Sequence, residues 1–236
     1  MEHYTYLLVN FLSVSVPFLA GFHPLLKFYR EWKYLFPAMF TTLVFFISWD
    51  ILFTNLGVWG FNPKYVTGFY VFNLPVEEWL FFITIPYASI FTYHALNILL
   101  KFKIPLKVTN FVSYCLVAIL LAIGVFGFPR LYTSVTFLLT AVFIFIHTVS
   151  IRQKYLGRFY FSYLVVLIPF FIVNGILTGS FIHHEVVWYN SDQILNIRML
   201  TIPVEDSIYG MLLLMMNITL YEHFKSKGKI SFGYKV

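Results

Sequence analysis

Seven long apolar stretches constrain the fold of this chain more than any other feature. They cover residues of about 4–22, 34–53, 75–99, 109–127, 131–151, 160–180 and 202–222. A bilayer core of about 30 Å is crossed by roughly 20 apolar helical residues, so each stretch is long enough for one span. Because 60% of the 236 residues are hydrophobic and only 11% are charged, little chain remains for a water-exposed domain. The sequence therefore predicts an all-α integral membrane protein, a bundle of seven helices.

The basic residues divide unevenly between the two ends of the predicted spans. Thirteen of the 16 fall on one side, namely Lys27, Arg30, Lys33, Lys101, Lys103, Lys107, Arg152, Lys154, Arg158, Lys225, Lys227, Lys229 and Lys235. The other side receives only Lys64, Arg130 and Arg198. Basic loops mark the cytoplasmic side of a membrane. We therefore expect a multi-pass protein of the cell inner (plasma) membrane, with its N-terminus outside and its C-terminus in the cytoplasm. The net charge of +6 then reflects topology and not a nucleic-acid partner.

An internal repeat relates the two halves of the chain. A shift of 128 positions lays Pro75-Val76-Glu77-Glu78 on Pro203-Val204-Glu205-Asp206, and Tyr93 on Tyr221. The preceding loops, residues 58–62 and 187–190, also correspond if a small gap is allowed. We predict a first repeat of three helices over residues 1–105, a joining fourth helix over 106–128, and a second repeat with a basic cytoplasmic tail over 129–236. An intervening span makes the repeats parallel, so both acidic motifs are expected at the same, outer, face.

Each acidic motif places two adjacent carboxyls at a helix start. Proline is favoured at the first position of a helix, and a carboxylate there interacts well with the helix dipole. A well-made helix start is therefore one interpretation. The other is functional, because ionisable groups at a membrane usually mark a site, and a carboxyl kept protonated in an apolar pocket is a Brønsted acid. We predict Glu77, Glu78, Glu205 and Asp206 as catalytic residues of acid chemistry.

Aromatic side chains, 22% of the chain, suit such chemistry. Their ring faces stabilise a cation without trapping it, although most of them are expected in lipid-facing positions or interfacial belts. Asp50, with Asn174 at the matching place of the second half, either lines the site or is an ordinary interfacial residue. Arg198 either pairs with a carboxylate or meets lipid headgroups. The residues predicted to bind substrate are Asp50, Asn174, Arg198, Trp49 and Trp79.

Cofactors are not expected. His183 and His184 lack a third ligand at metal spacing, so no metal site is predicted. A Gly-x-Gly-x-x-Gly motif following a strand is also absent from the sequence, so nothing indicates a dinucleotide fold.

With two Pro-x-Glu-Glu/Asp motifs, one in each three-helix unit, the chain resembles the membrane-integral lycopene cyclases of the heterodimeric type, here with both subunits fused. The resemblance covers essentially the whole chain. It implies a lycopene beta-cyclase of carotenoid biosynthesis, an intramolecular lyase or isomerase that forms β-ionone type rings without net redox change and without flavin. A carboxylic acid would protonate the terminal double bond of a ψ end of lycopene, a neighbouring alkene would attack the cation, and proton loss would leave the ring double bond. The resemblance also implies that the four carboxyls serve a joint site.

The expected partners are therefore lycopene, taken from the lipid bilayer, and the membrane lipids. Two alternatives from other classes are a proton-coupled transporter with paired carboxylates as the relay and a non-catalytic carotenoid-binding membrane protein. The sequence does not distinguish a β from an ε ring or one ring from two, and it does not identify the proton donor or the oligomeric state.

Overall fold

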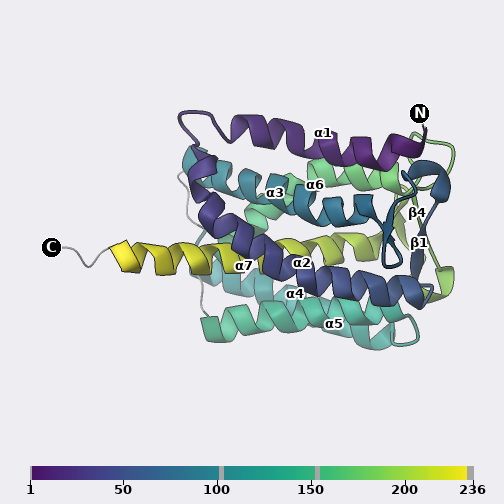
Figure 1. Cartoon of the computed structure of the whole chain (residues 1–236). Coiled ribbons are helices and arrows are strands. Elements are labelled where there is room, and N and C mark those ends of the chain that lie inside the picture. The colour runs from purple at the N-terminus through teal and green to yellow at the C-terminus, as the bar shows by residue number, and fades with distance from the viewer. Residues whose placement is uncertain (1, 101–103, 152–154, 233–236) are drawn as a thin grey trace.

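A bundle of long helices, shown in Figure 1, forms the body of the molecule. The computed structural model describes residues 2–100, 104–151 and 155–232. Its α-helices are α1 (Thr5–Ala20), α2 (Trp32–Asn55), α3 (Val76–Leu99), α4 (Leu106–Phe126), α5 (Leu131–Ile146), α6 (Leu156–Leu177) and α7 (Val204–Phe232). Each of the seven predicted stretches is helical, which confirms the all-α class. The predicted loop and tail residues Lys101, Lys103, Arg152, Lys154 and Lys235 lie outside the described residues.

Helix α7 differs from its neighbours. Within the described residues, the six spans that are long and apolar enough to cross a membrane are those built on α1 to α6. Helix α7 has 29 residues but starts with two acids and carries the buried Asn217. It packs against α2 and α5, so much of its surface faces protein instead of lipid. It also runs on to Phe232, so Lys225 and Lys227, predicted in a tail after residue 222, belong to the last turns of this helix.

Short strands and turns cap the end of the bundle that carries the N-terminus (Figure 1). The strands are β1 (Trp59–Phe61), β2 (Tyr70–Val71), β3 (Leu74–Pro75), β4 (Val187–Tyr189), β5 (Arg198–Met199) and β6 (Ile202–Pro203). The short helical turns at this end are η1 (Glu2–Tyr4), η3 (Pro63–Tyr65) and η5 (Ser191–Gln193), whereas η2 (Phe28–Glu31) and η4 (His147–Ile151, of π type) follow α1 and α5 at the other end. Strands β2 and β3 form a hairpin that leads into α3, and β5 and β6 form one that leads into α7.

The two halves follow the same path through these hairpins. The N–H of Val76 donates to the carbonyl of Phe69 at 2.9 Å, and Val204 donates to Ile197 at 3.0 Å, with every position shifted by 128. The hairpin turns also match, since Phe72 and Leu200 both adopt positive φ angles, of 56° and 59°. Helices α3 and α7 therefore start at the same end of the bundle, as the parallel-repeat hypothesis predicted.

Strands β1 and β4 join the two halves. Gly60 pairs with Trp188, flanked by Trp59 with Tyr189 and by Phe61 with Val187. Since residue 188 is residue 60 shifted by 128, the pseudo-twofold axis passes through this central pair. The gap that we expected in the loop alignment is therefore wrong, because Gly60 and not Trp59 is the counterpart of Trp188. The Trp188 ring lies against Gly60, where an added Cβ would be 2.4 Å from it.

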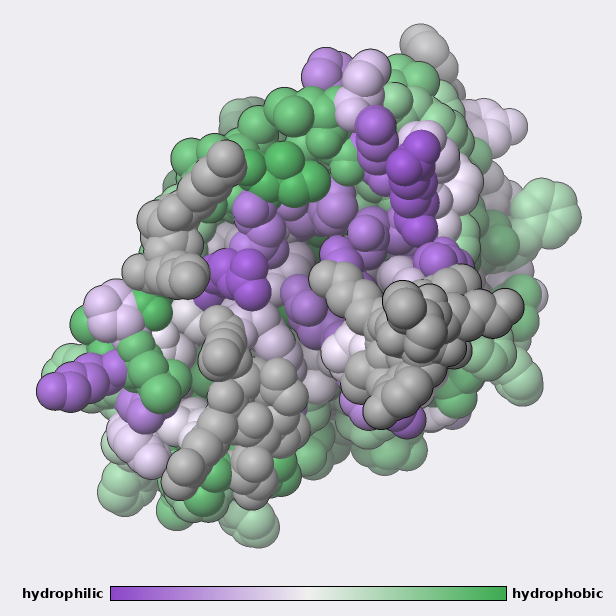
Figure 2. Space-filling view, turned by 90° about the vertical axis from the view of Figure 1, so that its left-hand side faces the viewer, coloured by the Kyte–Doolittle hydropathy of each residue, from purple (hydrophilic) through white to green (hydrophobic). Residues whose placement is uncertain are grey.

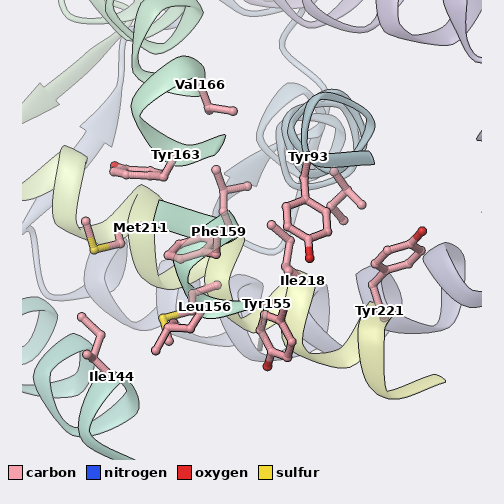
Figure 3. Close-up of a cluster of buried hydrophobic side chains, with 14 of the residues drawn as sticks. Tyr93, Ile144, Tyr155, Leu156, Phe159, Tyr163, Val166, Met211, Ile218 and Tyr221 are labelled. Carbon is pink, nitrogen blue, oxygen red and sulfur yellow. The ribbon is translucent and has the colours of Figure 1, made fainter. Parts of the chain in front are cut away.

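The helices pack around two clusters of buried apolar side chains. Figure 3 shows part of the first, in which Phe159 and Tyr163 of α6 lie beside Met211 of α7. The end of the bundle at the C-terminus is different, and Figure 2 shows polar side chains gathered in a hollow at its centre. We call it the basic end, since Lys225 and Arg158 line a polar pocket there, and we call the strand-capped end the acidic end.

Candidate active site

The first carboxyl of each acidic pair holds the hairpin that precedes its helix. Glu77 is fully buried, and its Oε1 accepts a hydrogen bond from the backbone N–H of Thr67 at 2.7 Å. Glu205 is also fully buried, and its Oε1 accepts from the backbone N–H of Leu195 at 2.7 Å and from the Thr133 hydroxyl at 2.6 Å. Both carboxyls lie in the first turn of a helix, where the helix dipole favours negative charge. This geometry ties the loop to the helix start in both halves.

The second carboxyl of each pair accepts hydrogen bonds from tyrosines. Glu78 Oε2 accepts from the Tyr6 hydroxyl of α1 at 2.5 Å. Asp206 Oδ1 accepts from the Tyr132 hydroxyl of α5 at 2.8 Å, and its Oδ2 accepts from Tyr189 at 2.9 Å. Tyr6 and Tyr132 both lie near the start of the first helix of their repeat. A repeated tyrosine therefore orients each of these carboxyls.

Tyr189 lies in the loop strand β4, outside the membrane-spanning helices. Burial raises its pKa well above the ordinary value, and the neighbouring Asp206 carboxylate adds to the effect. The phenol therefore stays protonated and remains a hydrogen-bond donor to Asp206.

A third carboxyl, Asp50 of α2, lies in the same region. It is 3% exposed, and its Oδ1 accepts from the indole N–H of Trp59 at 2.6 Å, while Oδ2 has no hydrogen-bond partner among the described residues. Its predicted counterpart Asn174 does stand at the matching place. The equivalent residues Val58 and Val186 donate to the carbonyls of Phe53 and Leu177, so these two carbonyls correspond. Asp50 comes three positions before Phe53, and Asn174 comes three positions before Leu177.

Three of these acids face one cavity of about 340 Å³, within the usual range for a small-molecule site. They are Glu78, Asp206 and Asp50, and Asn174 joins them in the wall. The aromatic residues of the wall are Tyr6, Trp59, Phe61, Phe81, Phe82, Tyr132, Tyr163, Phe170, Tyr189 and Tyr209. Among the described residues the Tyr209 hydroxyl is buried without a hydrogen-bond partner. The cavity thus combines proton donors and acceptors with aromatic faces that stabilise a cation.

The other predicted site residues lie outside the cavity wall. Glu77 and Glu205 bind the hairpins, as described above. Trp49 packs edge-on against Phe53 behind the wall, and the Trp79 indole donates to the carbonyl of Val71 at 3.4 Å. Arg198 is exposed, and its guanidinium donates to the Thr201 carbonyl at 2.5 Å. The predicted pairing of Arg198 with a carboxylate is not among the ion pairs of the described chain.

Sequence reasoning missed the tyrosines. Tyr6 and Tyr132 both stand at the second residue of their helices, α1 and α5, so a repeat comparison extended to these helices would have paired them. The offset there is 126 and not 128, which hides the match when one constant shift is applied. Tyr209 has Phe81 at its equivalent place, so no repeat signal was available for it.

Comparison with known proteins identifies one family. A family model described as lycopene cyclase matches the chain twice, over residues 3–96 and 129–224. No curated protein and no solved structure matches the chain. The two matched regions contain one acidic pair each and correspond to the two structural halves.

Proposed function

The chain belongs to the lycopene cyclase family and carries the family's domain twice; on that premise, we propose that it closes β-ionone type rings at the ψ ends of lycopene by acid-initiated carbocation cyclisation. The family match supports carotenoid cyclisation in general. The ring type, the acid mechanism and the assignment to the intramolecular lyases are our proposal. We also propose that the first repeat ends at residue 105 and that the joining helix ends at residue 128.

One observation carries the proposal. Glu78 and Asp206, the second acids of the two repeated motifs, line the same aromatic cavity. Protonation of an unactivated alkene requires an acid held against the double bond away from water. The cation that results needs electron-rich surfaces without a strong nucleophile, and tyrosine, tryptophan and phenylalanine rings supply them.

The reaction balances without an oxidant or a reductant. One carboxyl transfers a proton to the terminal carbon–carbon double bond, which produces a tertiary cation. The π electrons of a neighbouring double bond form the ring bond, and a second carboxyl accepts the proton lost from an adjacent carbon. Glu78 and Asp206 are the candidates for these two roles, and Oδ2 of Asp50, which has no hydrogen-bond partner among the described residues, is a further candidate acceptor. Glu77 and Glu205 act as positioning residues that hold the hairpins.

We propose the same orientation as the basic loops predict, with the acidic end outside and the basic end in the cytoplasm of a plasma membrane. Lys27, Arg30 and Lys33 lie on or before α2, at the basic end with Lys225. Alkaline phosphatase fused after α2 or after α6 should be active; inactive fusions at both places would overturn this orientation.

The test of the function uses membranes from bacteria that express the full chain, supplied with lycopene in D₂O. Cyclisation by external protonation should yield cyclic products that contain one solvent deuterium for each ring. Cyclic product without deuterium would refute the acid mechanism. Lycopene that co-purifies unchanged with the folded protein would refute the cyclase and indicate a carotenoid-binding protein, and a proton flux without pigment conversion would indicate a transporter.

A further inference from the structure

The cavity is long and follows one side of α3. Its wall includes Glu78 near the start of this helix and Thr92 fourteen positions later. At 1.5 Å per helical residue, that separation corresponds to roughly 20 Å. Between them, α3 contributes Phe81 and Phe82 next to Glu78 and then the smaller Ile85, Ala88 and Ser89. The acids therefore lie at one end of an elongated space that runs into the middle of the bundle.

The cavity opens sideways between α1 and α6. Leu12 and Val16 of α1 line it, yet these side chains are 66% and 70% exposed. Pro169 of α6 also lines it and is exposed. A residue that both lines a cavity and remains largely exposed lies at its mouth.

The surface around this mouth is apolar. The exposed large side chains along α1 and α6 are Leu8, Phe11, Leu12, Val16, Phe18, Leu19, Leu164, Ile168 and Ile172. Since α1 and α6 are both candidate membrane spans, these side chains suit contact with lipid chains and not with water. The mouth therefore faces the hydrocarbon of the bilayer.

Several equivalent positions in the other half carry larger side chains. The repeat relates α1 to α5, α3 to α7 and α6 to α2. The side of the bundle between α5, α7 and α2 is therefore the counterpart of the side between α1, α3 and α6. Met216 stands there for Ala88, Asn217 for Ser89, Phe143 for Pro17 and Trp49 for Val173, although Gly210 stands for Phe82. Trp49 is 7% exposed and stacks on Phe46, and Asn217 accepts a hydrogen bond from Thr42 at 2.9 Å. The pseudo-twofold axis thus relates the acids of the two halves but not the space beside them.

We propose that the acyclic hydrocarbon enters from the bilayer through the opening between α1 and α6, end group first, and that this single path serves one end of the substrate at a time. The inference rests on the proposed function. Both Glu78 and Asp206 then act on the same end group. A substrate with two reactive ends must withdraw and enter again in the opposite direction before the second ring forms.

Two matched variants test the path. Val16→Trp places a large ring at the mouth, and Val142→Trp places it at the equivalent, 50% exposed position of α5. Val16→Trp fills space that the substrate needs and should lower conversion about tenfold or more, because a steric cost of about 1.4 kcal/mol to substrate binding already gives a factor of ten. Val142→Trp should convert at the wild-type rate. Ala88→Phe, farther along the path, should lower conversion as Val16→Trp does.

The outcomes separate this inference from the function itself. Equal rates for Val16→Trp and Val142→Trp, in a protein whose wild type cyclises lycopene, would overturn the lateral path and leave the cyclase intact. Loss of conversion in both, at normal expression and with unchanged elution from size exclusion, would also overturn it. A wild type that forms no ring refutes the proposed function on which the inference rests. A time course should show one-ring product first; two-ring product released from the start without it would overturn the one-end claim.

Discussion

In the first half of the molecule Glu78 accepts a hydrogen bond from Tyr6, and in the second half Asp206 accepts one from Tyr132, the equivalent tyrosine. The hairpins agree as closely, since Thr67 donates to Glu77 and Leu195 donates to Glu205 over the same 2.7 Å. Beside these acids the halves diverge, because Ala88 lines open space where its counterpart Met216 fills the bundle.

This comparison separates two demands on the repeated unit. Holding the carboxyls at a helix start needs a hairpin and a tyrosine, and both copies retain them. Admitting a long substrate needs empty volume, and empty volume costs packing energy, on the order of 24 cal/mol for each Å³ of cavity. One open side supplies the space at about half the loss of packing that two open sides would require. The duplicated unit therefore keeps both acids but only one path.

The largest expected effect comes from removing the cavity acids one at a time. Glu78→Gln and Asp206→Asn are each expected to lower conversion by about 10²–10⁴-fold, the usual effect of losing a general acid or base. Asp192→Asn, an exposed carboxyl at the same end, serves as the control and should convert like the wild type. Pigment extraction and chromatography measure all three. If either cavity variant converts like the control, one acid is dispensable and the two halves are not catalytic partners.

The next prediction concerns the tyrosine donors. Among the described residues Glu78 accepts from one hydroxyl, that of Tyr6, whereas Asp206 accepts from Tyr132 and Tyr189. A hydrogen bond to a charged group contributes about 1.5–3 kcal/mol, so Tyr6→Phe should lower conversion about tenfold or more. Tyr132→Phe should have a smaller effect, and the double variant Tyr132→Phe/Tyr189→Phe should match Tyr6→Phe. Equal losses in the two single variants would show that Tyr189 does not support Asp206.

The sequence predicted the helices and the acidic motifs because these features are local. Apolar stretches of a fixed length indicate spans, and the start of α3 with Pro75 and two acids repeats at the start of α7. The shift of 128 positions also linked Tyr93 with Tyr221, and both hydroxyls donate to carboxyls, although the acceptors Glu222 and Glu31 are not related by the repeat. A single helix that joins two three-helix units predicts parallel repeats. The structure agrees, because α3 and α7 start at the same end of the bundle.

The sequence could not show which acid of each pair faces the cavity. Adjacent helical residues point about 100° apart, and only the packing of α1 and α5 decides that Glu78 and Asp206 point inward. Trp49 and Trp79 were predicted to bind substrate because they stand near the acids in sequence. Trp49 instead stacks on Phe46 and packs behind the wall residue Tyr209, and Trp79 stacks on Phe72, so neither ring lines the cavity.

The two halves meet at the pseudo-twofold axis, where Gly60 of β1 pairs with Trp188 of β4. In Gly60→Ala the new Cβ would lie 2.4 Å from the Trp188 ring, so β1 and β4 must shift. We expect a loss of about 1–3 kcal/mol in stability, the usual result of overpacking. Gly60→Ala/Trp188→Ala should recover most of it, because the ring that clashes is gone. Gly175→Ala, whose Cβ would lie no nearer than 3.5 Å to a neighbour, is the matched control. Thermal unfolding in detergent measures all of them, and an unchanged Tm for Gly60→Ala would contradict the close approach of the two strands.

The smallest expected effects are at the basic end, where tyrosines also bind carboxyls but no acid lines the large cavity. The Tyr93 hydroxyl donates to Glu222 at 2.7 Å, and Tyr221 donates to Glu31 at 2.9 Å, beside the ion pair of Glu31 with Lys225. Tyr93→Phe and Tyr221→Phe should each lower stability by only about 0.5–1.5 kcal/mol and leave lycopene conversion unchanged. By contrast, Tyr6→Phe removes the same kind of hydroxyl at the acidic end and is expected to lower conversion. If Tyr93→Phe lowered conversion as much as Tyr6→Phe without a matching fall in Tm, the chemistry would not be confined to the acidic end.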